Sequence, residues 1–436
     1  MLLRAVAISV VVSGLTVATA PLSRAADASE VEIQAAYLED MKALKSNPRV
    51  QEAMAHIVDI EPQSEADLVE LTEIPAPPFK EEVRAARFAE MLRAAGLEDV
   101  TIDGVGNVIG RRRGTVGDKR IAYAAHLDTV FPEGTDVTVR YEGKRMIAPG
   151  IGDNTRGLVT VLGVLRAMQH ADIQTEAEIL FIGNVGEEGL GDLRGTKYLF
   201  RDGAEKIDTF VAVDGGNSER IVYGGVGSHR YRVTFRGPGG HSWGAFGLAN
   251  PHHALGRAIA LFDEMAPEVT TVGEKTSYNI GRIGGGTSIN SIPFESWMEV
   301  DMRSGSQDKL DDIDAVLKKA IDQALAEENA GRLDGEALTV DVKRVGTRPA
   351  AMGDPEGVLV QRAMAATKAL GIDPSLQISS TDSNLPLSIG VPAVTMSRGG
   401  VSKGAHSLDE WWENVDGHKG IQIGLLTLLA EAGLVN

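Results

Sequence analysis

The chain has 436 residues, of which 43% are hydrophobic, so it is long and apolar enough for two folded domains rather than a disordered segment. Its formal net charge of −18 argues against nucleic acid or an anionic membrane surface as a partner, because both are bound through clustered cations. The absence of cysteine excludes thiol catalysis, cysteine-ligated zinc and disulfide bonds.

The first 25 residues differ from the rest of the chain. Arg4 precedes an apolar run of small residues from 5 to 20, which is too short to span a bilayer securely, and Ser23-Arg24-Ala25 resembles a signal-peptidase cleavage site. This pattern predicts a signal peptide over residues 1–25 and an exported protein, either periplasmic or secreted. An uncleaved membrane anchor is the alternative interpretation.

The segments that follow predict an α/β domain. Residues 27–65 are charged and have a helical period, which indicates a pair of surface helices, and an amphipathic helix over 79–97 and a hairpin over 100–114 come next. Apolar strands then alternate with helices, as the strands at 121–126, 177–186 and 208–216 and the helix at 157–168 show. Nearly continuous apolar strands between helices are typical of a buried, mostly parallel sheet. We therefore expect residues 26–222 to form the first part of a larger domain.

The pattern changes near residue 223. From there to residue 345 the order is strand, helix, two strands joined through a Gly-rich turn, a long helix ending at Gly331, and a strand. This β-α-β-β-α-β order is the ferredoxin-like arrangement of a small separate domain. After residue 346 the α/β pattern resumes with a helix at 357–370, a strand at 391–397 and a last helix at 417–432. The small domain, 223–345, is thus inserted into the larger one, whose second part is 346–436.

Several polar motifs end apolar strands or lie in the loops just beyond them, where open α/β sheets bind their ligands. Each has an ordinary structural interpretation when taken alone, as a loop histidine, a solvated glutamate pair, a turn aspartate or a helix cap. Their occurrence together at equivalent topological positions favours a functional site. The motif residues are His126 and Asp128, Asp153, Glu187 and Glu188, Asp214, and His406.

This residue set suits two metal ions. Imidazole nitrogen and carboxylate oxygen are ligands for zinc, with cobalt or manganese as alternatives. A two-ion site needs a bridging carboxylate, and two histidines with three carboxylates supply a symmetric set. One further carboxylate then remains as a general base.

The series H-x-D, D, E-E, D and H, in this order and with these surroundings, closely resembles the M20 family of metallopeptidases, which includes glutamate carboxypeptidase, peptidase T and aminoacylase-like enzymes. The resemblance covers about residues 65–436. It implies a zinc-binding α/β domain that carries an inserted dimerisation or lid domain. An aspartate at position 214 resembles the carboxypeptidase and aminotripeptidase members of the family. The amidohydrolase branch that contains cysteine is excluded, because this chain has no cysteine.

The resemblance implies a role for each motif residue. Asp153 bridges the two ions through a loop in which the Asp153–Asn154 peptide is cis, and Asp128 orients the first histidine from behind. Glu187 takes a proton from the attacking water and delivers it to the leaving nitrogen. The remaining ligands form two pairs, His126 with Asp214 and Glu188 with His406.

The inserted domain carries three further residues that match the family. His241, in GPGGHS, is expected to polarise the scissile carbonyl, often in the active site of the partner subunit of a homodimer. Asn290 and Arg303 are expected to hold the carboxylate of the substrate, for which the fork of an arginine is well suited.

Two points depart from the family pattern. Asn154 and Thr155 stand where relatives often have other residues in the bridging loop. The 27–65 extension matches no family motif and is a candidate cover for the cleft.

Three hypotheses remain at this stage. The first is a two-zinc exopeptidase or dipeptidase, the second an N-acyl amino acid amidase, and the third a catalytically inactive binding protein of the same fold. The sequence does not distinguish the first two, and it does not say which end of a peptide is cleaved.

Overall fold

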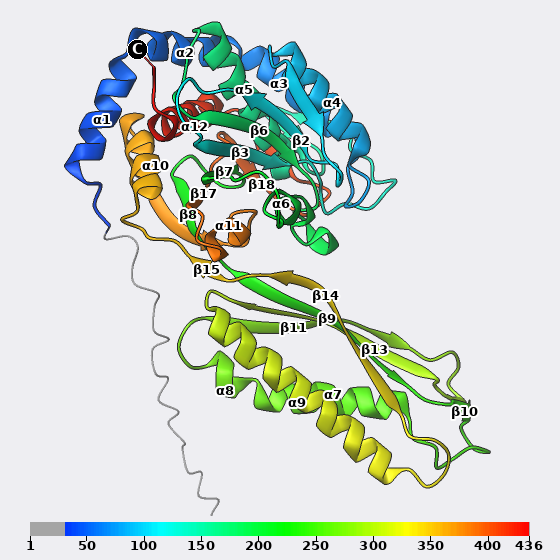
Figure 1. Ribbon diagram of the computed structural model, residues 1–436. Helices are drawn as coiled ribbons and strands as arrows, with labels where there is room; N and C mark the ends of the chain where they lie inside the picture. Colours follow the sequence, from blue (N-terminus) through cyan, green and yellow to red (C-terminus); the bar gives the residue numbers. More distant parts are fainter. Residues whose placement is uncertain (1–30, 436) are drawn as a thin grey trace, which may run out of the picture.

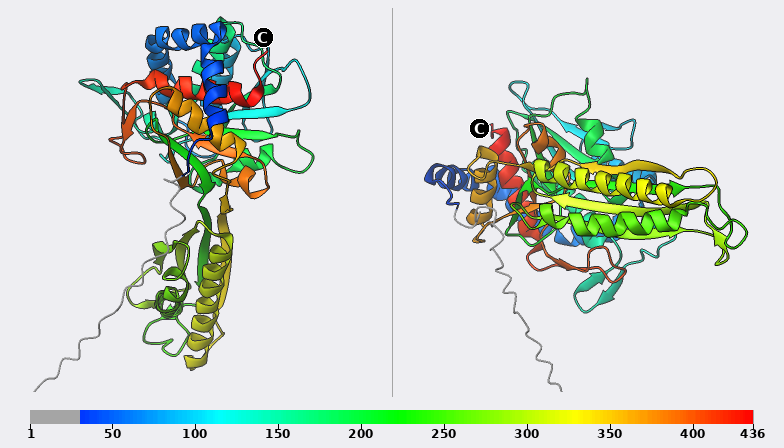
Figure 2. Two further views of the ribbon diagram at one scale, coloured as in Figure 1. Left: turned by 90° about the vertical axis from the view of Figure 1, so that its left-hand side faces the viewer. Right: turned by 90° about the horizontal axis from the view of Figure 1, so that it is seen from below.

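The computed structural model describes residues 31–435 and shows two domains (Figure 1). The larger domain is formed by the segments that precede and follow the smaller domain in the sequence. The smaller domain is elongated and extends away from the larger one (Figure 2). The predicted signal peptide lies outside the described residues. Within residues 31–435, no helix combines the length and the apolar character that crossing a membrane requires.

The large domain is built on a nine-stranded mixed sheet. Its order is β1-β2-β6-β3-β7-β17-β8-β15, and β16 pairs with β8. The central strands β6, β3, β7 and β17 run parallel, and the antiparallel pairs lie toward the edges. The mostly parallel sheet expected from the sequence is confirmed. The bounds are β1 (Asp99–Ile102), β2 (Val108–Arg112), β3 (Arg120–His126), β6 (Glu178–Asn184), β7 (Thr209–Val213), β8 (Arg220–Gly225), β15 (Ala351–Met352), β16 (Ser375–Ser379) and β17 (Ala393–Met396).

Both faces of the sheet are buried, which explains the unbroken apolar strands. In β3, Ile121, Tyr123 and Ala125 pack into the main core with α4 (Glu82–Ala94), α5 (Gly157–His170), α10 (Val358–Ala369) and α12 (Gly417–Ala432). Ala122 and Ala124 point to the other face, into a smaller core beside α6 (Arg194–Leu199) and α11 (Asn384–Ser388). Alternation along a strand thus supplies apolar side chains to two separate cores.

The N-terminal extension forms three helices, so the prediction of two helices from the sequence is wrong. They are α1 (Ala35–Ser46), α2 (Pro48–Asp59) and α3 (Glu61–Thr72). The break between α1 and α2 falls at Asn47, whose side chain accepts the backbone N–H of Arg49, and Pro48 occupies the first turn of α2. The first two helices pack on α5, α10 and α12, on the outside of the large domain.

A small four-stranded sheet, β18-β19-β5-β4, was not predicted from the sequence. It joins residues far apart in the chain, because β5 (Arg145–Ile147) pairs with β19 (Trp411–Glu413). The other members are β4 (Arg140–Glu142) and β18 (Val401–Lys403). The loop between β18 and β19 carries His406 and Glu410, so this sheet determines where both residues lie.

The small domain has the predicted β-α-β-β-α-β order. Its antiparallel sheet runs β11-β13-β9-β14, with α7 and α9 packed on the sheet. Alternate residues of β13 are buried, which matches a sheet covered by helices on one side. A two-stranded piece, β10 with β12, lies at the far tip (Figure 1). The bounds are β9 (Gly227–Arg236), β10 (Gly240–His241), α7 (Pro251–Met265), α8 (Pro267–Thr270), β11 (Thr276–Gly285), β12 (Ser291–Ile292), β13 (Glu295–Ser304), α9 (Gln307–Gly331) and β14 (Thr339–Arg348).

The chain passes between the domains through two adjacent connections. It leaves the large sheet at the end of β8, Gly225, and returns after β14, at Arg348; the sequence placed these boundaries at residues 223 and 345. The returning connection ends beside the strand ends that carry the polar motifs, because Arg348 contacts Glu187.

Candidate active site

The motif residues of the large domain meet at the carboxyl ends of the parallel strands. His126 is the last residue of β3, Asp214 directly follows β7, and Glu187 and Glu188 follow β6 after a turn. The turn contains Gly186 in the left-handed region, at a φ of 67°. The carboxyl ends of neighbouring parallel strands thus bring together residues that are up to 88 positions apart in the sequence, from His126 to Asp214.

Asp153 lies on a tight turn, Ile151–Arg156, that leads into α5. The Asp153–Asn154 peptide bond is cis, as the resemblance to the family implied. The buried carboxylate of Glu410 accepts three backbone N–H groups of this turn: Oε1 accepts from Gly152 at 2.9 Å and from Asp153 at 2.6 Å, and Oε2 accepts from Gly150 at 3.0 Å. Burial and, after it, the charge of Asp153 raise the pKa of Glu410 to about 7. Sequence reasoning missed Glu410, although it is only four residues beyond His406.

The carboxylate of Asp153 faces two histidines from opposite sides of the site. Its Oδ1 lies 3.3 Å from His126 Nε2, and its Oδ2 lies 3.4 Å from His406 Nε2. His406 Nε2 also lies 2.9 Å from Glu188 Oε1. Two sets with ligand atoms close enough to share an ion therefore meet at Asp153: His126, Asp153 and Asp214, and Asp153, Glu188 and His406.

The donor atoms of the first set fit a metal ion. His126 Nε2 and Asp153 Oδ1 are buried and make no hydrogen bond within residues 31–435, a costly arrangement unless something else binds them. Burial opposes ionisation of Asp153, but the close contacts with the two histidines and the charge of Arg398 hold its pKa well below its usual range. The charged carboxylate is therefore ready to accept a cation without first losing a proton.

Asp128 supports the site mainly through the glutamates. Its buried carboxylate accepts the backbone N–H of Glu187 at 3.0 Å and of Glu188 at 2.8 Å. The ring of His126 is positioned by the main chain of the same residue, because its Nδ1 lies 3.0 Å from the carbonyl oxygen of Asp128 and 3.7 Å from its carboxylate. The sequence assigned the orientation of this ring to the Asp128 side chain; in the structure the carbonyl oxygen makes the closer contact.

Glu187 is buried against an arginine. Arg348 Nη1 donates to Glu187 Oε1 at 2.7 Å, and its Nη2 donates to the backbone oxygen of Glu187. Burial raises the pKa of Glu187 well above its usual range, although the charge of Arg348 acts in the opposite direction. A carboxyl group whose pKa is raised binds a proton more readily than an exposed glutamate does, as a general base requires.

A second buried arginine, Arg398, contacts two of the candidate ligands. Its Nη1 lies 3.4 Å from Asp214 Oδ1 and 3.7 Å from Asp153 Oδ1. Neither Arg348 nor Arg398 was predicted as a site residue. Arg348 is the last residue of β14, and Arg398 lies two residues beyond the end of β17. No motif marked either of them in the sequence.

The three small-domain residues lie in two different places. Arg303, on β13, lines the hollow that contains the candidate ligands. His241 and Asn290 lie together at the tip, where the backbone N–H of Ser242 donates to the carbonyl oxygen of Asn290 at 2.9 Å. Neither of them lines the hollow within this chain.

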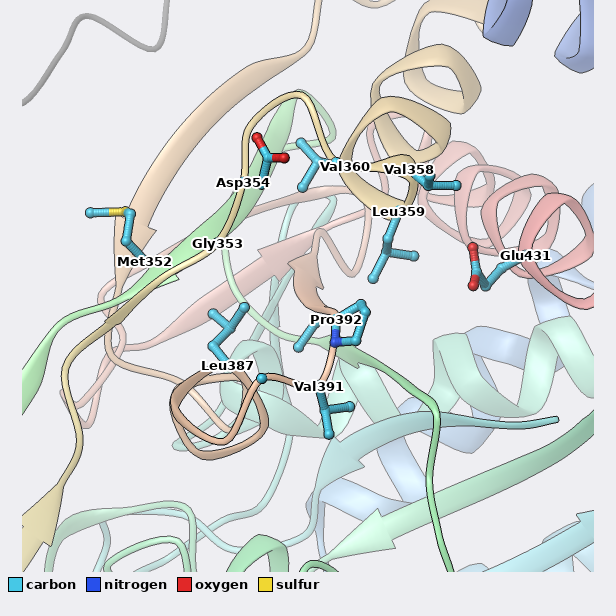
Figure 3. Close-up of a pocket in the computed structure, with 13 residues that line it drawn as sticks. Met352, Gly353, Asp354, Val358, Leu359, Val360, Leu387, Val391, Pro392 and Glu431 are labelled. Carbon is cyan, nitrogen blue, oxygen red and sulfur yellow. The ribbon is translucent and has the colours of Figure 1, made fainter.

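The hollow at the candidate ligands has a volume of about 210 Å³. A larger hollow of about 330 Å³ lies elsewhere in the large domain, beside α10 and α11 (Figure 3). Its walls are mostly apolar, with Leu359, Leu387 and Pro392 among them, and its Glu431 is already paired with Lys119 and Arg362. The smaller hollow is therefore the candidate active site. It is lined by Asp153, Glu187, Glu188, Asp214, Gly215, Arg220, Arg230, Arg303, Arg348, Ser379, Ser380 and His406.

The fold and this site together define a metal-dependent hydrolase. The sequence model of peptidase family M20/M25/M40 matches residues 122–430, and the chain belongs to this family. The family membership, the fold and the enzyme class expected from the sequence are thus confirmed, and the hypothesis of an inactive binding protein loses its ground.

Similar proteins agree with this assignment. The chain is 26% identical over 309 residues to the uncharacterized protein YqjE of Bacillus subtilis (strain 168), a match that covers 69% of this chain and 78% of that protein. It is 24% identical over 225 residues to carboxypeptidase G2 of Pseudomonas sp. (strain RS-16), covering 50% of this chain and 51% of that one.

Solved structures share the fold. Aminopeptidase PepT from Bacillus cereus ATCC 10987 has a TM-score of 0.67 and 23% identity, with 84% of this chain and 97% of that one covered. The dipeptidase Dug1p from Saccharomyces cerevisiae has a TM-score of 0.69 and 16% identity, covering 88% and 98%.

Proposed function

We propose that the chain is an exported exopeptidase that uses two zinc ions to hydrolyse amide bonds in small peptides. The observation that carries this proposal is the position of Asp153, whose two oxygens lie 3.3 Å from His126 and 3.4 Å from His406. A carboxylate between two sets of ligands is the bridge that a two-ion site needs. His126 and Asp214 would hold one ion, Glu188 and His406 the other, and cobalt or manganese would suit the same atoms.

Ions held by these residues supply Lewis acidity toward a carbonyl oxygen and toward water. Glu187 moves the proton: it takes one from the attacking water and returns it to the leaving nitrogen. Because Arg348 occupies Oε1 of Glu187 at 2.7 Å, Oε2 is the oxygen that carries this proton. A hollow of about 210 Å³ has room for a residue or two of substrate, which supports an exopeptidase rather than an enzyme that cleaves within long chains.

The proposed enzyme works as a homodimer. His241 and Asn290, the residues proposed to polarise the carbonyl and to hold a carboxylate, lie at the tip of the small domain rather than in the hollow of their own chain (Figure 1). Apolar side chains beside them are open to solvent, with Trp243 87%, Phe246 80% and Ile289 fully exposed. Such a patch is typical of a surface that another molecule covers, and a second copy is the partner we propose.

An N-acyl amino acid amidase is the second candidate. Arg303 lines the hollow, and the free carboxylate it would hold is common to peptides and N-acyl amino acids. Export rests on the pattern of residues 1–25 alone, and the periplasm or the outside of the cell is the proposed location.

The test combines metal removal with a change of the base. We expect a chelator to abolish hydrolysis of dipeptides, tripeptides or N-acyl amino acids, and zinc or cobalt to restore it at two ions per chain. Glu187→Gln should keep two ions but lower kcat roughly 10²–10⁴-fold, whereas Glu336→Gln, an exposed glutamate of the small domain, should leave kcat unchanged. Full activity in excess chelator, or an unchanged kcat in Glu187→Gln, would contradict the proposal.

A further inference from the structure

The segment that follows Glu187 and Glu188 has an unusual backbone. Asp192 and Leu193 both lie in the left-handed region, at φ of 54° and 57°, between the short turn Gly189–Gly191 and α6. Residues with a Cβ adopt this region at a conformational cost, and it is rare for a bulky side chain such as leucine. Two such residues in succession therefore need contacts elsewhere in the molecule that hold them in place.

Contacts of this kind come from the small domain. Asp192 Oδ1 accepts the backbone N–H of Thr347 at 2.8 Å, and Lys197 Nζ donates to the carbonyl oxygen of Thr347 at 2.9 Å. Lys197 also pairs with Asp192 Oδ2 at 2.6 Å, so the two side chains together hold both main-chain groups of one residue. Thr347 lies near the end of β14, the edge strand of its sheet, and edge strands leave main-chain groups free for such contacts. We call Asp192, Lys197 and Thr347 the clamp.

The clamp lies directly beside the proposed base. Thr347 precedes Arg348, which donates to Glu187 through both of its Nη atoms. A further contact joins the same segments, since Arg230 Nη1 of the small domain donates to the carbonyl oxygen of Gly189 at 2.8 Å. Because Thr347 and Arg348 are adjacent in the chain, a shift of the Thr347 main chain also shifts the guanidinium that holds Glu187.

We propose that Asp192 is a positioning residue of the hydrolytic reaction, which acts through Thr347 and Arg348 to hold Glu187 in place. This inference rests on the proposed function, because it takes Glu187 as the base. A general base has to lie within hydrogen-bond reach of the proton that it takes, and a displacement of about 1 Å can lower the rate about 10²-fold. Aspartate suits this position, since its carboxylate accepts hydrogen bonds from two directions and its backbone adopts the left-handed region more readily than most.

A purely structural role is the competing interpretation. The clamp joins the two domains, so its loss lowers the melting temperature whether or not it positions the base. Asp208 supplies a matched control, because its carboxylate makes the same two kinds of contact at the opposite end of β3 from His126. It accepts the backbone N–H of Arg120 at 2.9 Å and pairs with Lys206. Its side chain is 19% exposed, against 21% for Asp192.

The experiment measures kcat and KM for dipeptides and N-acyl amino acids on the zinc-loaded full chain, well below its melting temperature. In Asp192→Gly the backbone keeps the left-handed region without cost, so only the contacts of the side chain are lost. We expect this variant to lower kcat roughly 10-fold to 100-fold and to keep its KM and zinc content, because Glu187 acts in the chemical step. Asp192→Asn keeps an oxygen for the N–H of Thr347 and should retain most of kcat. Asp208→Ala should lower the melting temperature and leave kcat unchanged.

Each other outcome has a definite meaning. An unchanged kcat in Asp192→Gly assigns the clamp to stability alone, which overturns the inference and leaves the proposed function standing. A raised KM at unchanged kcat also overturns it, because the clamp would then place groups that bind the substrate. If the wild-type chain hydrolyses none of these substrates, the proposed function fails, and hydrogen exchange decides the inference. Faster exchange of the backbone N–H groups of Glu187 and Glu188 in Asp192→Gly, but not in Asp208→Ala, supports the positioning role. Equal exchange in the wild type and both variants overturns it.

Discussion

Glu410 shows how a single buried residue can determine the shape of the site without being a ligand. Its carboxylate receives three backbone N–H groups from the turn that presents Asp153, and it lies 99% buried. Groups that orient metal ligands typically change metal affinity or activity about 10–100-fold when they are replaced. Glu187 and Arg348 form a buried ion pair. Loss of one partner costs about 3–5 kcal/mol of stability, because it leaves the other charge buried and unpaired.

The replacement Glu410→Gln tests this positioning role. The amide keeps the shape of the side chain but directs an NH₂ group at one of the three N–H donors, so the turn shifts and Asp153 with it. We expect the affinity for zinc, measured by competition with a chelator, to fall roughly 10–100-fold. The control is Glu431→Gln, another buried carboxylate of the large domain, paired with Lys119 and Arg362. This variant should lower the melting temperature and leave zinc affinity unchanged. A Glu410→Gln protein with a lower melting temperature but an unchanged affinity for zinc would refute the positioning role.

At the scale of elements, the helices of the N-terminal extension pack on the outside of the large domain and line no part of the hollow among the described residues. They are therefore not the cover for the cleft that the sequence left open. The contact between α2 and α5 includes His56 and His170, whose rings stack 3.8 Å apart and nearly parallel. Burial, and then the charge of His170, lower the pKa of His56 from its usual 6.5; Asp59 opposes this shift and Arg166 adds to it.

This lowered pKa predicts a pH dependence of stability. The folded state disfavours protonation of His56, so neutral His56 adds to the free energy of unfolding. This contribution is complete above pH 6.5, and it is lost as the pH falls from 6.5 toward the lower pKa that His56 has in the folded state. We expect the melting temperature to fall between about pH 7.5 and pH 5.5, and His56→Gln to reduce this dependence, as measured by calorimetry. His253→Gln, an exposed histidine of the small domain, should not reduce it. An identical pH dependence in His56→Gln would rule out this contribution.

At the scale of the whole molecule, the separation of the small-domain tip from the hollow is the main organising feature. Four of the candidate ligands, the base and Arg303 line one hollow, whereas His241, on β10, and Asn290 lie at the tip of the elongated small domain (Figure 1). A second copy that brings its tip to this hollow would complete the proposed set of residues. The exposed Trp243 and Phe246 beside His241 would then become buried.

Mixed subunits test this arrangement. Chains with Glu187→Gln and chains with His241→Ala should each have low activity. When they are unfolded, mixed and refolded together, the mixed dimers have one hollow with both residues intact, so we expect activity to return to about a quarter of the wild-type value, from half the dimers with one of two sites. The control is a mixture of Glu187→Gln with Glu336→Gln/Glu187→Gln chains, which should recover nothing. No recovery in the first mixture would mean that His241 does not act across subunits.

The sequence by itself determined the layers, the inserted domain and the residues that end the strands. These follow from local patterns: periods of two and 3.6, unbroken apolar strands, and polar residues directly after them. It therefore yielded His126, Asp153, Glu187, Glu188, Asp214 and His406, which the structure brings together. The cis peptide at Asp153 also agreed, through the resemblance to the family.

Only the tertiary structure decided what surrounds them. Glu410, Arg348, Arg398 and Arg220 act on the site from loops and strand ends that are up to 260 residues away along the chain, as in the contact from Glu410 to Gly150. A lone buried charge has no periodic or spacing signal, because its significance depends on which charge stands opposite it after folding. The same holds for the tip of the small domain, whose distance from the hollow is set by the length of its strands and not by any motif within them.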